Sequence, residues 1–162
     1  MKFELWPFER GREWTVKASF VLETEYGDIF VYKGFIHDGD SVVVNWKETD
    51  QRIVEKVLPA IVHDFLYWHR VKATGFTVSR LEADRIYRAL CKSSTNWFRR
   101  QFANLRYWGV RKFGDTPWDS RPGPVPLPAE WQYMYGPTPT ACDLRAKCDR
   151  YGIRNGRIAR LQ

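Results

Sequence analysis

The residues best suited to chemistry fall into three short stretches of the sequence. The first is a loop, residues 37–41, that reads His-Asp-Gly-Asp-Ser. The second is the pair His63 and Asp64, and the third is Asp84. A histidine beside carboxylates is the combination that general acid–base catalysis requires, and carboxylate oxygens are the ligands that Ca²⁺ prefers. Either chemistry requires a fold that brings the three stretches together.

Two predicted helices carry His63 and Asp84. Pro59 is typical of a first helical position, and polar and aromatic residues then repeat at helical spacing up to about His69. The second helix opens on residues 79–82, Ser-Arg-Leu-Glu, which form a capping box. Its apolar stripe consists of Ala83, Ile86, Tyr87 and Leu90. In an antiparallel pair of these helices, His63 and Asp84 differ in level by roughly 3 Å.

This pairing predicts a general base. Asp84 would accept a hydrogen bond from His63, fix its tautomer and raise the basicity of its other ring nitrogen, with Ser41 as a possible nucleophile. Asp64 points about 100° away from His63 on the helix, toward the loop, where Asp38 would help it hold Ca²⁺. The structural alternative stays open, since a His–Asp pair between helices is also a common way to satisfy a buried histidine.

The other elements predict an α+β domain. The side chains of residues 14–22 alternate with a period of two, which predicts a strand with one buried face. A turn at 25–28 and a second strand over 29–32 are expected to follow. Residues 42–44 are expected to add a short third strand. A third helix, capped by residue 95 or 96, runs to about Phe113. Its core-facing residues are expected to be Phe98, Phe102, Leu105 and Trp108.

The C-terminal third differs in composition. Seven of the nine prolines lie between Pro117 and Pro139, which predicts an extended arm over 115–140 in place of regular helix. A short helix over 141–150 and a basic tail over 141–162 follow. We therefore expect a small N-terminal antiparallel sheet packed on about three helices in residues 1–114, then the arm and the tail. The predicted partner-binding residues are Trp118, Trp131, Tyr133, Tyr135, Arg154, Arg157 and Arg160.

Composition narrows the class of protein. The chain has 162 residues and 44% hydrophobic side chains, enough for one domain with a core. No run approaches the ~18 apolar residues of a membrane span, and the first residues lack a signal core, which predicts synthesis and folding in a cytoplasm. The net charge of +7 invites a nucleic-acid partner, but the excess is concentrated in residues 79–114 and 141–162. No nucleic-acid-binding motif accompanies it.

Four ordered motifs resemble a phage and prophage family called domain of unknown function 1353. They are residues 34–42, Gly-Phe-Ile-His-Asp-Gly-Asp-Ser-Val; 60–67, Ala-Ile-Val-His-Asp-Phe-Leu-Tyr; 79–87, Ser-Arg-Leu-Glu-Ala-Asp-Arg-Ile-Tyr; and 107–114, Tyr-Trp-Gly-Val-Arg-Lys-Phe-Gly. The resemblance covers roughly residues 12–115 and implies a phage or prophage gene made in a host cytoplasm. The matching polar positions are Asp38, Ser41, His63, Asp64 and Asp84, while His37, Asp40 and Val43 depart from the family pattern.

Three functions follow as hypotheses. The first is a virion- or assembly-associated protein that docks on other virion proteins through its C-terminal arm and is incorporated into the virion. The second is a small hydrolase of lipid or cell wall that uses His63 with Asp84; its His-Asp-x-x-Tyr helix is similar to that of the secreted calcium-dependent phospholipases, although their disulfide frame and calcium loop are missing here. The third is a nucleic-acid-binding accessory protein.

Overall fold

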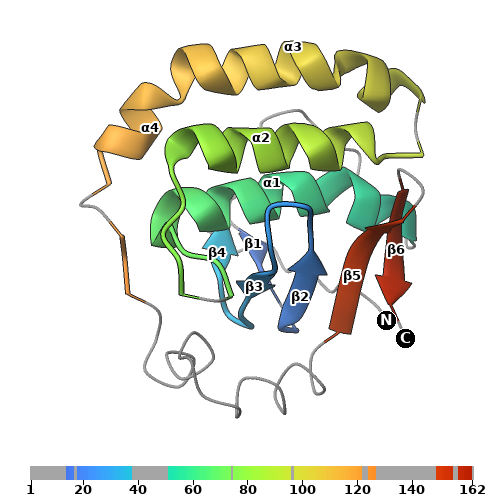
Figure 1. Cartoon of the computed structure of the whole chain (residues 1–162), viewed down its shortest axis with the longest axis horizontal. Coiled ribbons are helices and arrows are strands. Elements are labelled where there is room, and N and C mark those ends of the chain that lie inside the picture. The colour runs from blue at the N-terminus through green and yellow to red at the C-terminus, as the bar shows by residue number, and fades with distance from the viewer. Residues whose placement is uncertain are drawn as a thin grey trace.

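The computed structural model describes residues 14–16, 18–37, 51–73, 75–95, 97–121, 124–126, 149–154 and 157–161. It is an α+β fold in layers, as the sequence predicted. The strands lie below helix α1, α2 lies on α1, and α3 forms the outermost layer on the far side of α2 (Figure 1). Within the described residues, no helix is long and apolar enough to cross a membrane.

Two sheets form the lower layer. The strands β1 (Trp14–Thr15) and β4 (Ile36–His37) make an antiparallel pair. The second sheet has the order β3-β2-β5-β6, from β2 (Phe20–Glu23), β3 (Ile29–Val31), β5 (Asp149–Arg154) and β6 (Arg157–Leu161). In this sheet β2 and β5 run parallel, and the other neighbours run antiparallel.

The predicted hairpin is present, but the predicted strand over 14–22 is broken. The chain leaves β1 at Val16, whose N–H donates to the carbonyl of Phe35, and starts β2 at Phe20. Phe20, Val21 and Leu22 are all buried, so β2 shows no alternation between a buried and a solvated face. The reason is its central position between β3 and β5. Residues 42–44 lie outside the described residues.

The segment predicted as a tail supplies two strands of the domain's own sheet. Residues 20–23 of β2 pair with residues 149–152 of β5 in parallel, and β6 continues the sheet beyond β5. The predicted helix over 141–150 is therefore wrong at its end, because Asp149 and Arg150 are the first residues of β5. Residues 141–148 lie outside the described residues.

The helices are α1 (Gln51–His69), α2 (Arg80–Lys92), α3 (Trp97–Phe113) and the short α4 (Asp115–Asp119). Two proline-based predictions are wrong. Pro59 lies inside α1, where burial of the neighbouring Val57 and Leu58 offsets the lost backbone hydrogen bond. Pro117 lies in the first turn of α4, where the N–H that a proline lacks would have no helical partner.

The core lies between the sheet and α1, with α2 contributing from above. It contains Phe20, Phe65, Leu66, Ile86 and Leu90, and the predicted stripe of α2 is buried as expected. The prediction for α3 is wrong. The four residues expected to face the core, Phe98, Phe102, Leu105 and Trp108, are all exposed, and Ala103 is the buried residue of this helix.

Candidate functional site

The α1–α2 pair brings His63 and Asp84 into contact, as their levels on the two helices predicted. The distance between His63 Nε2 and Asp84 Oδ1 is 2.9 Å. Asp84 lies one turn into α2, which begins where the Ser79 hydroxyl accepts a hydrogen bond from the Glu82 N–H. The predicted N-cap therefore sets the start of the helix and, with it, the position of Asp84. Glu82 pairs with Lys72.

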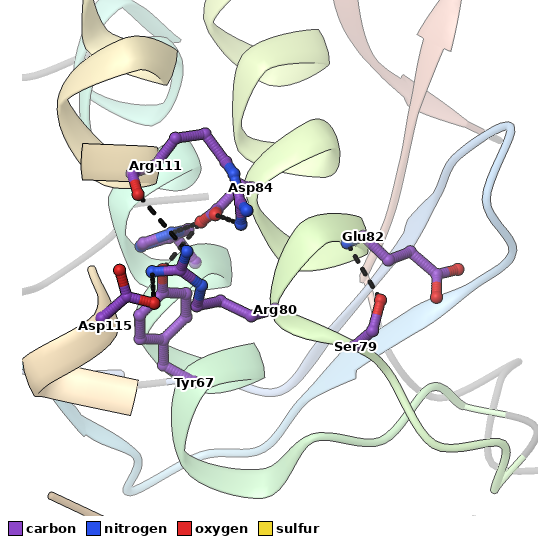
Figure 2. Close-up of polar contacts among 8 residues, drawn as sticks. Tyr67, Ser79, Arg80, Glu82, Asp84, Arg111 and Asp115 are labelled. Atoms are coloured by element: carbon purple, nitrogen blue, oxygen red, sulfur yellow. Dashed lines mark hydrogen bonds and ion pairs between the residues drawn. The ribbon is translucent and has the colours of Figure 1, made fainter. Parts of the chain in front are cut away.

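Asp84 accepts two further hydrogen bonds that the sequence analysis did not anticipate. The Tyr67 hydroxyl donates to Oδ1 at 2.8 Å, and Arg111 Nη1 donates to Oδ2 at 2.9 Å. Figure 2 shows Tyr67 and Arg111 converging on Asp84 from α1 and from the end of α3. The signal for Tyr67 was available, since it lies four residues after His63 on the same helix face. The motif at residues 107–114 contains Arg111, but nothing in the sequence indicates that this arginine contacts Asp84.

These donors determine the charge state of the carboxylate. The side chain of Asp84 is fully buried, which by itself raises its pKa, but the hydrogen bonds from His63, Arg111 and Tyr67 outweigh burial and hold the pKa below its ordinary value. Tyr67 stays a protonated donor, because burial and its bond to Asp84 raise its pKa far above the ordinary value. Asp84 is thus an ionised acceptor at neutral pH.

An ionised Asp84 fixes the orientation of the His63 ring. A neutral imidazole in contact with a carboxylate carries its proton on the facing nitrogen, here Nε2, and leaves Nδ1 as the basic atom. The ring packs against Tyr67 and Tyr87, at centroid distances of 4.1 and 4.8 Å, and its side chain keeps 11% of its surface exposed. The imidazole is therefore held firmly, and a small part of the side chain stays exposed.

A second layer of contacts fixes the end of α3 that carries Arg111. Arg80 donates from Nη2 to the backbone carbonyl of Arg111 at 3.3 Å and forms an ion pair with Asp115 at 2.8 Å (Figure 2). The helix ends at Phe113 and is followed by Gly114, where an added Cβ would lie 2.5 Å from the Tyr67 hydroxyl and nearer still to the Val110 carbonyl oxygen. The absence of a side chain at Gly114 lets α3 approach Asp84.

The remaining catalytic and metal predictions are not brought into this site by the described residues. Asp38 and Ser41 lie outside them. Asp64 is half-buried on α1, next to His63, and His37 is buried in β4 with its ring stacked on Phe35. Within the described ranges, no cluster of three or more His, Cys, Asp or Glu residues could hold a metal ion. The calcium site of Asp38 and Asp64 stays a prediction.

The predicted partner-binding residues divide into three groups. Trp118, on α4, packs on its own domain: its ring meets Tyr67 edge-on, and Arg70 lies 4.1 Å from the ring and donates to its carbonyl. Arg154 and Arg157 are exposed at facing ends of β5 and β6. The other residues cannot be placed, because Trp131, Tyr133, Tyr135 and the side chain of Arg160 lie outside the described parts of the structure.

A cavity of about 520 Å³ lies away from this site. Its lining includes Glu23, Lys92, Ser93 and Arg154, at the opposite end of α2 from Asp84. The cavity is therefore not evidence for a binding site at His63 and Asp84, and this candidate site is identified from its hydrogen bonds.

The comparisons with known proteins identify a family but no activity. The sequence profile of the family described as "Protein of unknown function (DUF1353)" matches residues 14–110, and the chain belongs to this family. The match contains His63, Tyr67 and Asp84 and ends just before Arg111. No curated protein and no solved structure matches the chain.

Proposed function

We propose that this member of the DUF1353 family is a hydrolase in which His63 activates a water molecule. The observation that carries the proposal is the 2.9 Å contact that orients His63 on a buried, ionised carboxylate while part of the His63 side chain stays exposed. The bond cleaved would be an ester or amide of the cell envelope, in lipid or in cell wall. Both substrates contain a carbonyl carbon that a hydroxide can attack.

The proposed hydrolysis needs a single base, which takes a proton from water and later donates it to the leaving group. His63 Nδ1 takes a proton from water as the water oxygen bonds to the substrate carbonyl carbon, and the negative charge moves to the carbonyl oxygen. The resulting imidazolium is stabilised by Asp84 through Nε2–H. When the bond to the leaving group breaks, Nδ1–H supplies the proton that the leaving alcohol or amine needs, and His63 is again neutral.

Asp84 and its donors act as positioning residues in this scheme. Arg111 binds Oδ2, and Tyr67 and His63 share Oδ1, so the carboxylate cannot rotate without breaking a hydrogen bond. A fixed carboxylate keeps the imidazole in one tautomer and one orientation. This matters because a general base contributes about 10²–10⁴-fold to a rate only when it is aimed at the proton that it removes.

The test uses the full chain with two probes, phosphatidylglycerol–phosphatidylcholine vesicles and purified peptidoglycan. We expect release of product from one of them and a loss of at least about 100-fold in kcat for His63→Gln, which keeps a donor toward Asp84. His69→Gln, on the same helix, is the matched control and should retain the rate. Asp84→Asn should lower kcat and move the midpoint of the pH–rate profile, an effect that lost stability alone would not produce.

Two results would overturn the proposal. One is that the folded wild-type protein cleaves neither probe. The other is that folded His63→Gln cleaves as fast as the wild type, which would leave the His63–Asp84 contact a structural hydrogen bond. Far-UV circular dichroism of each variant separates loss of activity from loss of fold.

A further inference from the structure

The helix α3 turns its apolar face away from the protein. Phe98, Phe102 and Leu105 follow one another at helical spacing, within an arc of about 60° around the helix axis. Their exposure is large, reaching 65% for Phe98. The exposed apolar face of α3, called the outer face below, consists of Trp97, Phe98, Phe102, Leu105, Trp108 and Phe113.

Polar contacts between α3 and α2 explain why the outer face points away from the protein. Where α3 meets α2, Arg111 donates to Asp84, Arg106 donates to the Tyr87 hydroxyl, and Arg88 of α2 donates to Asn104. Two arginines of α3, Arg106 and Arg111, are thus hydrogen-bond donors toward the protein, beside a small apolar cluster of Tyr87, Cys91, Ala103 and Val110. In Figure 1, α3 is the outermost helix and covers α2 alone in the helical stack.

The charge of α3 indicates what can cover the outer face. The helix has five basic residues and no acidic one. Lys112 is exposed on the outer face, where it lies over the rings of Trp108 and Phe113. A second copy of this helix would bring like charges together, so the charge disfavours self-association. A negatively charged partner with an apolar interior matches both properties of the face.

We propose that the outer face of α3 binds the surface of a membrane that contains anionic lipids. The helix lies in the plane of the interface, with its phenylalanine and leucine side chains among the acyl chains. Its tryptophans lie at headgroup level, where this side chain is favoured. Lys112 contacts lipid phosphates. The proposal rests on residues other than His63 and Asp84, so it stands or falls independently of hydrolysis.

The test is co-sedimentation of the full chain with two kinds of vesicles, phosphatidylglycerol mixed with phosphatidylcholine, and phosphatidylcholine alone. We expect binding to the anionic vesicles that weakens as salt is added. The double variant Phe102→Ser/Leu105→Ser should bind about 30-fold more weakly, because two half-exposed apolar side chains no longer enter the lipid. The variant Lys112→Gln should bind roughly fivefold more weakly, because it removes one charge near the lipid phosphates.

Matched controls test whether the effects belong to α3. Phe76→Ser removes an exposed aromatic side chain and Lys92→Gln an exposed charge, both outside α3, and both variants should bind vesicles like the wild type. Because all the substituted side chains are exposed, the variants should fold, which thermal unfolding checks.

Four outcomes would overturn the proposal. The wild type could fail to bind anionic vesicles at low salt, or the outer-face variants could bind as well as the controls. Sedimentation equilibrium could show a dimer that Phe102→Ser/Leu105→Ser dissociates, which would assign the face to a second copy. A single-stranded oligonucleotide could bind, with the loss of affinity in the same variants, while vesicles do not, which would assign the face to nucleic acid.

Discussion

The hydrogen bonds to Asp84 predict a large and pH-dependent effect of replacing it. In Asp84→Asn the side chain keeps its shape and one acceptor oxygen, but the other oxygen becomes an NH₂ group. In the place of Oδ2 the NH₂ group faces the donor Arg111, whereas in the place of Oδ1 it would face both His63 and Tyr67, so the first orientation loses fewer hydrogen bonds. Since the side chain is fully buried, water cannot replace the lost bond on the Asp84 side.

The size of the effect follows from these contacts. A hydrogen bond to a charged group is worth about 1.5–3 kcal/mol, and the two bonds that remain lose their charge assistance. Arg111 is partly exposed and can turn to solvent, so the full penalty of a buried unpaired charge does not apply. We expect a loss of about 2–4 kcal/mol in the free energy of unfolding at neutral pH, a large part of the total for a small domain.

The dependence on pH distinguishes this mechanism from a simple packing defect. The pKa of Asp84 is lowered in the folded protein, so its contribution to stability is fully present above the ordinary value of 3.8 and is lost as the pH falls from there through the folded pKa. The stability difference between wild type and Asp84→Asn should therefore shrink in acid. Urea unfolding followed by circular dichroism, at neutral pH and below pH 3.8, measures both quantities.

Asp115→Asn is the matched control. This carboxylate also pairs with an arginine, Arg80, but its side chain is 66% exposed, so its removal should cost no more than about 1 kcal/mol. If Asp84→Asn and Asp115→Asn unfold at the same urea concentration, or if the Asp84→Asn deficit is unchanged in acid, the account of the buried carboxylate is wrong.

Two more predictions concern the ends of α1 and α3. Gly114→Ala should destabilise the protein by about 1–3 kcal/mol in urea unfolding, because its Cβ would clash with the Val110 carbonyl oxygen and with the Tyr67 hydroxyl. Gly109→Ala, with open space around the Cβ, should unfold at the same urea concentration or higher. Burial lowers the pKa of His69, although its hydrogen bond to the Val125 carbonyl acts in the opposite direction. The contribution of neutral His69 to the stability of the fold is therefore fully present above pH 6.5 and is lost as the pH falls from there through the folded pKa. His69→Gln should flatten the fall in Tm between neutral and mildly acidic pH, and an unchanged slope would contradict this.

The pair at the centre of the site was predictable because it depends on local rules. The capping box fixed the start of the second helix, and the connection from the first helix set the relative level of the two helices along their axes. The distance between His63 and Asp84 then followed from the rise per residue of a helix. Tyr67 follows from the same reasoning. Arg111 does not, since its contact depends on where a third helix packs, and helical spacing alone does not determine that.

The C-terminal strands were missed although the sequence contains a signal for them. The dipeptide Asn155-Gly156 lies between residues 149–154 and 157–161, and Asn-Gly between two short segments is a strong indication of a hairpin. The basic charge of the segment favoured a tail instead. The parallel pairing of β5 with β2 is a different matter, because it joins residues far apart in the chain and leaves no local pattern.

The error about α3 has a physical cause that also supports the proposal for its outer face. The prediction assumed that an amphipathic helix buries its apolar side, which holds when the neighbour offers an apolar surface. Here α2 offers Asp84, Tyr87 and Arg88, and α3 meets them with Arg106 and Arg111. A helix held by arginine donors on one side can keep its aromatic residues on the other. Leaving them exposed costs free energy in water, and an apolar surface with negative charge at its boundary would recover it.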